Sequence, residues 1–401
     1  MRTGVLGFQP ERLKQLRISA DMTQAMLADL LNCSAGNISK WESGRISPEV
    51  FNFRGICELF GVSESWLLEA PLKSSNSSPS FYRSQVSTPK AAWEIADARL
   101  SWLEEISYKL QETLEFPKVN IPIYQGNDVR VISDSEIEDL ADECRKRWGL
   151  GTGPIKDVIH VLESNGAVVA RSGIGYVKMD GISKWSKIDH RPYVLLAADK
   201  AGPIRNRFDA AHELGHVVLH SKISHDQYKA HYNLLEAQAH RFASAFLLPS
   251  DSFSFEVKWP SLDGLLALKG RWKVSVAAMI KRCQDLEIID PDVAARLWKG
   301  RSARHWVKNE PLDDSIDFEQ PKLLRRSIMI MVEQKILSKD ALRDVLGVPL
   351  KDLEELSSIS KGYLTEKSKD SVVDIRLKAK PGNINKSEIR KTAEILSFQK
   401  R

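Results

Sequence analysis

The sequence has 401 residues, 42% of them hydrophobic and 28% charged, a composition typical of a globular protein with two or three domains. It contains no run of eighteen apolar residues and no signal-peptide core, which excludes a transmembrane helix and predicts a cytoplasmic protein. Four widely spaced cysteines without a Cys-x-x-Cys pair argue against a disulfide framework. The net charge of +5 arises within residues 301–401.

Residues 8–70 carry the pattern of a small all-α domain. Thr23 and Ser34 can each accept backbone N–H bonds at a helix start, and Gly44 is suited to end a helix. The predicted helices are Glu11–Ile18, Thr23–Leu31, Ser34–Glu42, Pro48–Phe60 and a last turn at Glu64–Leu68. The residues expected in their common core are Leu13, Leu16, Leu27, Leu31, Ile38, Trp41, Ile56, Leu59, Val62 and Leu67.

A short turn at Asn32-Cys33 joins the second and third of these helices, as in a helix-turn-helix. The segment from Thr23 to Pro48 resembles the XRE/Cro repressor family, which binds operator DNA. That resemblance implies DNA contacts by Gln24, Ser34, Ala35, Gly36, Asn37, Ser39 and Lys40. Residues 1–70 carry 7 Lys/Arg and 8 Asp/Glu, so phosphate attraction is weak, and a module used only for protein contacts is the alternative.

Residues 71–133 are assigned to a linker and a connecting helix. The Ser/Pro-rich residues 71–80 predict a flexible linker. A long helical pattern follows from Lys90 to Leu114, with an aromatic stripe that includes Trp93 and Trp102. Such a stripe is typical of packing or of a dimer surface, and the helix is the candidate seam of a homodimer.

Residues 134–295 show the mixed pattern of an α+β domain. Helices are predicted at Ser135–Trp148 and Gly153–Ser164, and strands at Gly166–Arg171, Gly175–Ser183 and Tyr193–Ala198. We expect a small sheet with helices packed on one side. The sheet edge beside the site described next would bind an extended peptide by main-chain bonds.

The segment after these strands contains His212-Glu213-Leu214-Gly215-His216. Residues four apart lie on one face of a helix, so both imidazoles can reach one metal ion with Glu213 beside them. Zinc needs a further protein ligand, and Glu236, in a second Ala-rich helical segment, is the candidate. A solvated helix face is the alternative, but the apolar continuation of the first helix favours burial, where polar side chains need partners.

The runs Arg207–His220 and Glu236–Pro249 resemble the ImmA/IrrE metallopeptidases, in which Arg-Phe precedes the zinc helix and a second Glu-containing helix ends in Leu-Leu/Met-Pro. The connector, including Phe81-Tyr82-Arg83, is similar to that of proteins in which an XRE domain is fused to such a peptidase. The resemblance implies a small-sheet, zincin-like domain with Zn2+ held by His212, His216 and Glu236. Glu213 would be the general base of peptide hydrolysis.

Other polar residues near this motif have open roles. His220 would lie about 12 Å along the helix axis from His212, too far for the same metal, so we expect it beside a ligand or in the core. His240 is an alternative or additional ligand, and Asp209 is a candidate to orient His212. Candidates for stabilising a transition state are Tyr228, His231 and Tyr232.

The region 296–401 is predicted to be mainly helical. Within it, a helix is expected at 323–337, with two short helices in 338–353 around Gly347-Val348. Two further helices, at 262–269 and 274–283, are expected in the preceding domain of residues 134–295. The arrangement around Gly347-Val348 is similar to residues 59–67, so a second nucleic-acid module and a helical packing appendage are the two interpretations. Partial disorder is expected within residues 370–401.

These patterns together predict a transcriptional regulator that couples operator binding to zinc-dependent endopeptidase activity. The resemblance implies that the protein substrate is a helix-turn-helix repressor, cleaved in response to stress, phage or mobile-element signals. The alternative is a non-catalytic or self-cleaving repressor whose peptidase fold senses a ligand or partner. Glu213 argues against a non-catalytic protein, since a scaffold needs no general base.

Overall fold

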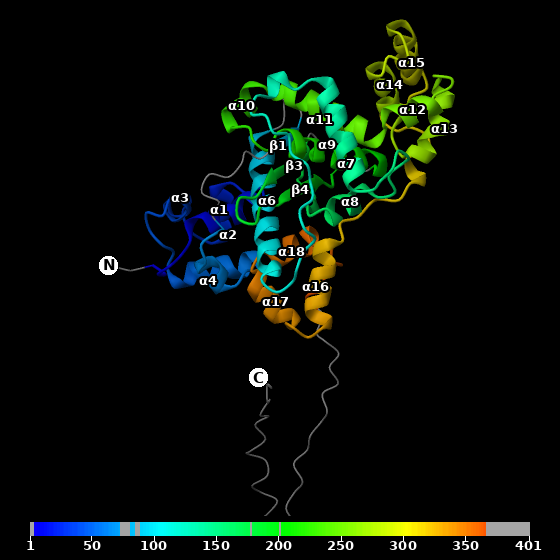
Figure 1. The fold of residues 1–401 in the computed structure, drawn as a ribbon. Helices are drawn as coiled ribbons and strands as arrows, with labels where there is room; N and C mark the ends of the chain where they lie inside the picture. Colours follow the sequence, from blue (N-terminus) through cyan, green and yellow to red (C-terminus); the bar gives the residue numbers. More distant parts are fainter. Residues whose placement is uncertain (1–3, 73–80, 85–88, 177–178, 200–201, 366–401) are drawn as a thin grey trace, which may run out of the picture. The chain divides into compact units, whose positions relative to one another are not determined.

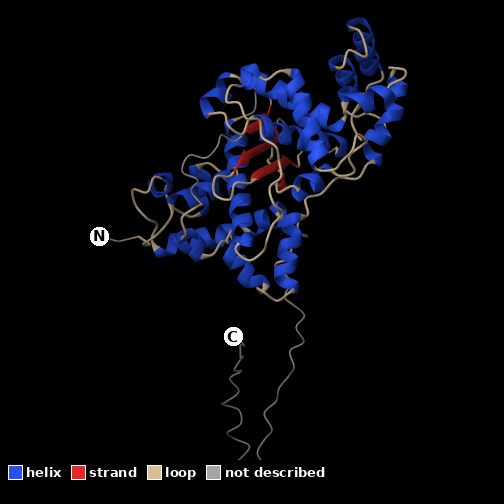
Figure 2. Ribbon diagram, in the orientation of Figure 1, coloured by secondary structure: helices blue, strands red, loops and turns tan. Residues whose placement is uncertain are grey.

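The computed structural model describes residues 4–72, 81–84, 89–176, 179–199 and 202–365 (Figure 1). Helices surround one four-stranded sheet, so the predicted α+β class is confirmed (Figure 2). Residues 73–80 of the linker predicted at 71–80, and residues 370–401, predicted to be partly disordered, lie outside the described residues. Within the described part of the chain, no helix combines the length and apolar character needed to cross a membrane.

The N-terminal region forms five short helices, as predicted. Thr23 accepts a bond from the backbone N–H of Met26 at 3.1 Å, and Ser34 accepts one from that of Asn37 at 3.2 Å, which confirms both predicted caps. The helices are α1 (Pro10–Ser19), α2 (Gln24–Leu30), α3 (Ala35–Glu42), α4 (Val50–Phe60) and α5 (Glu64–Leu68).

Nine of the ten residues predicted for the common core of these helices are buried, and Leu59 is the exception. Leu59 is 38% exposed, because α4 turns Phe53 and Ile56 toward the core instead. Trp66 on α5, which the predicted core did not include, is 1% exposed.

The sheet has the strand order β1-β3-β4-β2. β2 and β4 are parallel, and β3 is antiparallel to both of its neighbours. The first strand, β1, comes from the connector and was not predicted as a strand. The strands are β1 (Phe81–Ser84), β2 (Val168–Ser172), β3 (Met179–Trp185) and β4 (Pro192–Ala197).

Two hydrophobic cores lie on opposite faces of this sheet. On β4, Val194 and Leu196 belong to the core that contains α9 (Pro203–Leu219) and α11 (Tyr232–Leu247). Tyr193 and Leu195 belong to the other core, which contains α6 (Lys90–Gln111) and the N-terminal helices. Side chains alternate between the faces of a strand, so an entirely buried strand such as β4 is covered on both faces. The expectation of helices on one side only is therefore wrong.

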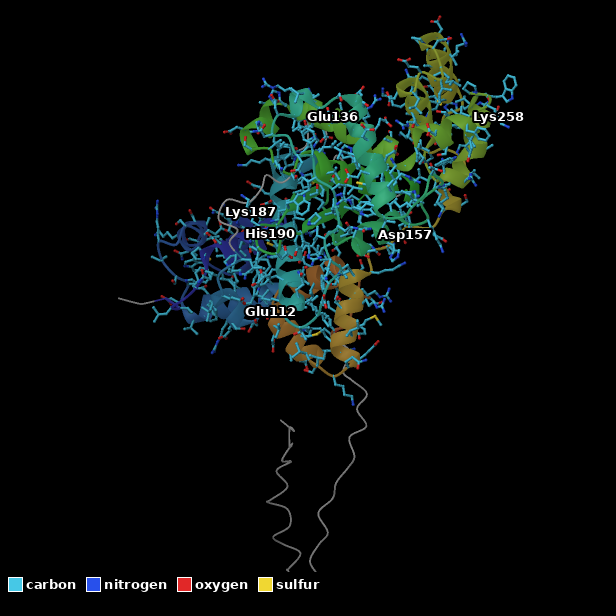
Figure 3. All side chains as sticks on the ribbon, viewed as in Figure 1. Glu112, Glu136, Asp157, Lys187, His190 and Lys258 are labelled. Carbon is cyan, nitrogen blue, oxygen red and sulfur yellow. The ribbon has the colours of Figure 1, made fainter. Side chains whose placement is uncertain are left out.

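The remaining helices differ from the predicted ones mainly in their limits. The helix expected from Gly153 begins only at Val158, where the Asp157 side chain (Figure 3) accepts the backbone N–H of His160 at 2.9 Å. The helix expected to reach Leu337 ends at Glu333, and Lys335 beyond it has a φ of 55°. Three helices, α10, α12 and α15, were not predicted. The elements are η1 (Val129–Val131), α7 (Asp134–Arg147), α8 (Val158–Ser164), α10 (His225–Ala230), α12 (Ser250–Glu256), α13 (Leu262–Trp272), α14 (Val276–Asp285), α15 (Pro291–Ala303), η2 (Asp313–Ser315), α16 (Leu323–Glu333), α17 (Lys339–Leu346) and α18 (Leu350–Leu356).

The connecting helix α6 is buried within its own chain. Glu105 accepts bonds from the buried guanidinium of Arg12 at 2.6 and 2.8 Å and from Trp66 Nε1 at 3.2 Å. Removing one partner of a buried ion pair typically costs about 3–5 kcal/mol, because the other charge is left buried and unpaired, so loss of Arg12 or Glu105 should destabilise the contact of the helix-turn-helix with α6. Six apolar residues of the predicted stripe are 0–2% exposed in the single chain, which favours packing within the chain over a dimer surface, and the dimer seam itself stays a prediction: Ile95, Leu100, Trp102, Leu103, Ile106 and Leu110.

The last three helices pack against α6 and β2. Glu355 accepts bonds from Ser172 Oγ at 2.9 Å and from the backbone N–H of Gly173 at 2.6 Å, at the end of β2. Gly347 after α17 and Gly61 after α4 have φ values of 70° and 65°, so in both regions a helix ends at a left-handed glycine. The contacts of α16–α18 favour the packing interpretation of this region over a second nucleic-acid module.

Candidate metal centre and nucleic-acid interface

The two helices that carry the predicted metal ligands, α9 and α11, pack directly against each other (Figure 1). A Cβ on Gly215 would lie 3.1 Å from the Cα and the carbonyl oxygen of Ala239 and 3.3 Å from Phe242 Cβ. A larger residue at position 215 would separate the helices. Gly215 and Ala239 therefore permit the approach that brings Glu236 to the two histidines.

The donor atoms of His212, His216 and Glu236 converge, and all lie within 4.8 Å of one another. His212 Nε2 lies 3.1 Å from His216 Nε2, and the Glu236 oxygens lie 3.4 Å from His212 Nε2 and 3.2 Å from His216 Nε2. Ligand atoms about 2.0–2.2 Å from a tetrahedral zinc ion are about 3.3–3.6 Å apart, close to these distances. The donor set and its spacing thus fit zinc.

The carboxylate of Glu236 is charged where the ligands meet. Burial alone would raise its pKa, but the hydrogen bonds with His212 and His216 outweigh burial and hold the pKa below the usual value of a glutamate. The two histidines are fully buried, whereas the Glu236 side chain is 17% exposed. A charged carboxylate with two imidazoles is one of the ligand combinations found in catalytic zinc sites.

Glu213 lies beside these donors and is held by the sheet. Ser183 Oγ on β3 donates to Glu213 Oε2 at 2.6 Å, and both side chains are fully buried. A Cβ on Gly181, two residues earlier in β3, would lie 2.9 Å from Glu213 Oε1. The strand therefore both orients the carboxylate through Ser183 and leaves space for it at Gly181.

His220 lies behind His216, away from the donor atoms. Its Nδ1 is 3.0 Å from His216 Nδ1, and its Nε2 is 3.0 Å from Gln238 Oε1. Gln238 Nε2 in turn donates to the Val129 carbonyl at 2.7 Å. Burial, followed by the neighbouring His216, lowers the pKa of His220 to about 3, so the ring is neutral at physiological pH. The position agrees with the expectation that His220 lies beside a ligand.

The other polar residues singled out in the sequence lie around this centre. His240 is exposed, its ring is 4.6 Å from that of His212, and it is outside the described donor cluster. Asp209 is buried. Tyr228 is also buried and packs edge-on against Tyr232 at 5.8 Å. Transition-state roles for these tyrosines and for His231 stay predictions.

Arg207, from the Arg-Phe pair, anchors the start of α9. Its guanidinium is buried and bonds the Ile155 carbonyl and the Glu319 carboxylate. Glu319 also accepts the backbone N–H of Val158 at 2.8 Å, at the start of α8. Arg207 therefore connects α9 to Ile155 and Glu319, and it is not among the residues that offer donor atoms for a metal.

The predicted peptide-binding edge beside the site is already paired. β1 runs antiparallel to β3, with Arg83 opposite Gly181, the residue that faces Glu213. A substrate strand beside the site must therefore add to β1 or replace it.

The surface of α3 is available for DNA. Ser34, Ala35, Gly36, Ser39 and Lys40 are exposed, and Asn37 is half-buried. Gln24 is half-buried, and its Nε2 donates to Glu42 Oε2 at 2.7 Å. Glu42 also binds Arg17 at 2.5 and 3.0 Å, so Gln24 already uses one amide N–H within the domain.

Sequence reasoning missed Gly181, Ser183 and Gln238. Ser183 and Gly181 are 30 and 32 positions from Glu213, and no local spacing joins a strand to a later helix. A weak signal exists for Gln238, a polar residue in an Ala-rich buried helix, since such a residue needs a hydrogen-bond partner.

Comparison with known proteins agrees with this geometry. Residues 13–67 match a helix-turn-helix family, and residues 163–284 match a peptidase family described as the IrrE N-terminal-like domain. The chain is also similar to the HTH-type transcriptional activator BcrR of Enterococcus faecalis, 41% identical over 58 residues. That match spans 14% of this chain and 28% of the relative, so it concerns a small part of each.

The fold and these matches place a helix-turn-helix domain of XRE type, over residues 13–67, and a metallopeptidase-type domain similar to IrrE, over residues 163–284, in one chain.

Proposed function

We propose that this regulator binds an operator through α3 and acts as a zinc-dependent endopeptidase on a helix-turn-helix repressor, in response to stress or mobile-element signals. One observation carries the peptidase proposal. The donor atoms of His212, His216 and Glu236 lie 3.1–3.4 Å apart, and Glu213 directly follows His212 in α9. Glu213 also favours an enzyme over a non-catalytic sensor, because a site that only bound metal would need no buried carboxylate beside its ligands.

His212, His216 and Glu236 would hold the metal in this proposal. Zinc bound there would polarise the scissile carbonyl and lower the pKa of water at the open position to about 7. Glu213 would accept the proton of the attacking water and pass it to the leaving amine. Ser183 fixes one oxygen of Glu213 and so restricts rotation of the carboxylate.

The peptidase proposal is tested by incubating the zinc-loaded chain with helix-turn-helix proteins encoded beside its own gene. Mass spectrometry of the products should show cleavage at a defined bond, and a zinc chelator should stop it. Fragments of the chain itself would instead support self-cleavage. Intact partners together with an intact regulator would contradict the endopeptidase proposal.

Replacing Gly181 with Ala should reduce cleavage while zinc content stays near that of the wild type. The new Cβ would lie 2.9 Å from Glu213 Oε1, closer than such atoms approach, so the carboxylate must move. A displacement of about 1 Å can cost roughly 10²-fold in rate. Gly153→Ala is a matched control, because a Cβ there meets nothing within 4 Å. Equal rates for all three proteins would contradict this placement of Glu213.

Replacing Lys40 with Ala should weaken operator binding by about 1–3 kcal/mol if Lys40 contacts a base, or reduce the salt slope by about 1 if it contacts phosphate. Lys40 is exposed near the end of α3. The control is Lys90→Ala, because Lys90 is 88% exposed on α6 and outside the helix-turn-helix. Footprinting at several salt concentrations measures both variants. A Lys40 variant with the wild-type affinity and salt slope would favour the protein-contact role of this module.

The operator geometry follows from whether the protein is a homodimer. A symmetric dimer would need half-sites about 34–36 Å apart, or a multiple of that distance. Because the apolar residues Ile95, Trp102 and Ile106 of α6 are buried within the single chain, such a dimer would use residues outside that buried stripe.

A further inference from the structure

The connector strand β1 covers the edge of the sheet that adjoins the candidate metal centre. Its Arg83 lies opposite Gly181 of β3, and its Phe81 lies opposite Ser183 (Figure 1). Gly181 and Ser183 both meet the carboxylate of Glu213, and β1 also contacts α9. β1 therefore occupies the place that an extended peptide beside Glu213 would take.

A substrate strand on the outer side of β1 would be too far from Glu213. Neighbouring strands are about 4.8 Å apart, so a strand added to β1 would lie about 10 Å from β3. A general base has to lie within about 3 Å of the group whose proton it accepts, or one water molecule away from it. Because Glu213 touches β3, only the position directly beside β3 is close enough.

The pairing of β1 with β3 is short and irregular. β1 has four residues, and its register shifts between Arg83 and Ser84, whereas β3 has seven residues. Such a shift interrupts the ladder of main-chain hydrogen bonds. A longer and regular substrate segment can therefore form more main-chain bonds with β3 than β1 does.

The connector that contains β1 is longer than its end points require. Glu69, directly after α5, binds Lys109 Nζ near the end of α6 at 3.0 Å, so the connector has to return along α6 to Lys90. This part of α6 spans about 28 Å, whereas the chain from 69 to 90 can extend over roughly 70 Å. The excess length allows β1 to leave β3 without moving the helix-turn-helix or α6.

We propose that β1 is a competing strand of the same chain, which occupies the edge of β3 and has to leave before an extended substrate segment can bind there. The inference rests on the proposed endopeptidase function, because the segment that replaces β1 is the one to be cleaved. A strand tethered in the same chain competes at an effective concentration on the order of millimolar. β1 therefore keeps weakly binding peptides away from Glu213.

A disulfide between β1 and β3 tests whether β1 has to leave. Tyr82 and Ile182 are Cα partners, and such partners lie about 4.5–5.5 Å apart, within the range of about 4.4–6.8 Å that a disulfide spans. Ile182 belongs to the core on the α6 face of the sheet, so the substitution lies on the opposite face of β3 from Gly181 and Glu213.

The locked strand should block cleavage. Zinc-loaded Tyr82→Cys/Ile182→Cys, when oxidised, should cleave fluorescent casein, an unfolded protein, at least about tenfold more slowly than after treatment with a phosphine reductant. Ile182→Cys alone is the matched control, because it has the same change in the core and the same four natural cysteines. The control should cleave at one rate in both conditions.

Peptide binding tests the exchange of strands without catalysis. A fluorescent peptide with the sequence of residues 79–86 should bind the wild type weakly and the oxidised disulfide variant not at all. In Tyr82→Pro/Arg83→Pro, one of the two prolines removes a backbone N–H that faces β3, because these groups alternate along a strand. If β1 is paired for about nine-tenths of the time, this variant should bind the peptide about tenfold more tightly than the wild type. Ser77→Pro/Ser78→Pro changes the connector outside β1 and should keep the wild-type Kd.

The outcomes separate this inference from the proposed function. Failure of every protein to cleave casein or a helix-turn-helix partner would contradict the endopeptidase function, and peptide binding would still decide the inference. Equal cleavage by the oxidised and reduced disulfide variant, or equal peptide binding by the wild type and the locked and proline variants, would overturn the inference alone. Cleavage of the chain itself within residues 81–84 would also overturn it, because β1 would then be a substrate.

Discussion

Replacing Glu213 with Gln is expected to abolish cleavage of a repressor substrate while leaving about one zinc ion per chain. The amide has nearly the size of the carboxylate but cannot accept the proton of the attacking water. General-base catalysis typically contributes about 10²–10⁴-fold, so the rate should fall by at least that range. The measurement is the single-turnover cleavage rate, with zinc determined by elemental analysis on the same samples.

Two control variants make the Glu213 result specific. Glu112→Gln changes an exposed carboxylate at the end of α6 and should cleave at the wild-type rate. Glu236→Gln replaces a proposed ligand and should lose zinc as well as cleavage. An unchanged rate in Glu213→Gln would exclude Glu213 as the base, and loss of zinc there would make Glu213 part of the metal site.

Replacing both His212 and His216 with Ala should reduce zinc from about one ion per chain to almost none. The double variant leaves Glu236 as one carboxylate on α11, and a single carboxylate does not retain zinc against a chelator. Cleavage should fall with the metal. Elemental analysis after dialysis against a chelator measures the first effect, and the repressor assay measures the second.

His240→Ala is the matched control for this pair. Its ring lies 4.6 Å from that of His212 but the residue is exposed and outside the donor cluster, so zinc should remain. Loss of zinc in His240→Ala would instead make His240 an additional ligand. Full zinc in the double variant would show that the metal binds elsewhere.

The predictions that succeeded from sequence are those whose signal lies within one element. The four-residue separation of His212 and His216 is enough to place both rings on one face of α9. A hydroxyl residue before an apolar run predicted the caps at Thr23 and Ser34 for the same reason. Glu236 was predicted as a ligand from the motif of its helical segment. Its distance to the histidines, however, depends on the packing of α9 against α11.

The features that only the tertiary structure decided all depend on which faces of different elements meet. Aromatic periodicity predicted a buried stripe on α6, but whether a second copy or the same chain covers it depends on Arg12, Glu105 and the sheet. The pairing of Ser183 with Glu213 and of Gln238 with His220 likewise joins residues 30 and 18 positions apart. Sequence periodicity determines what each helix or strand presents, whereas long-range packing determines which partner it meets.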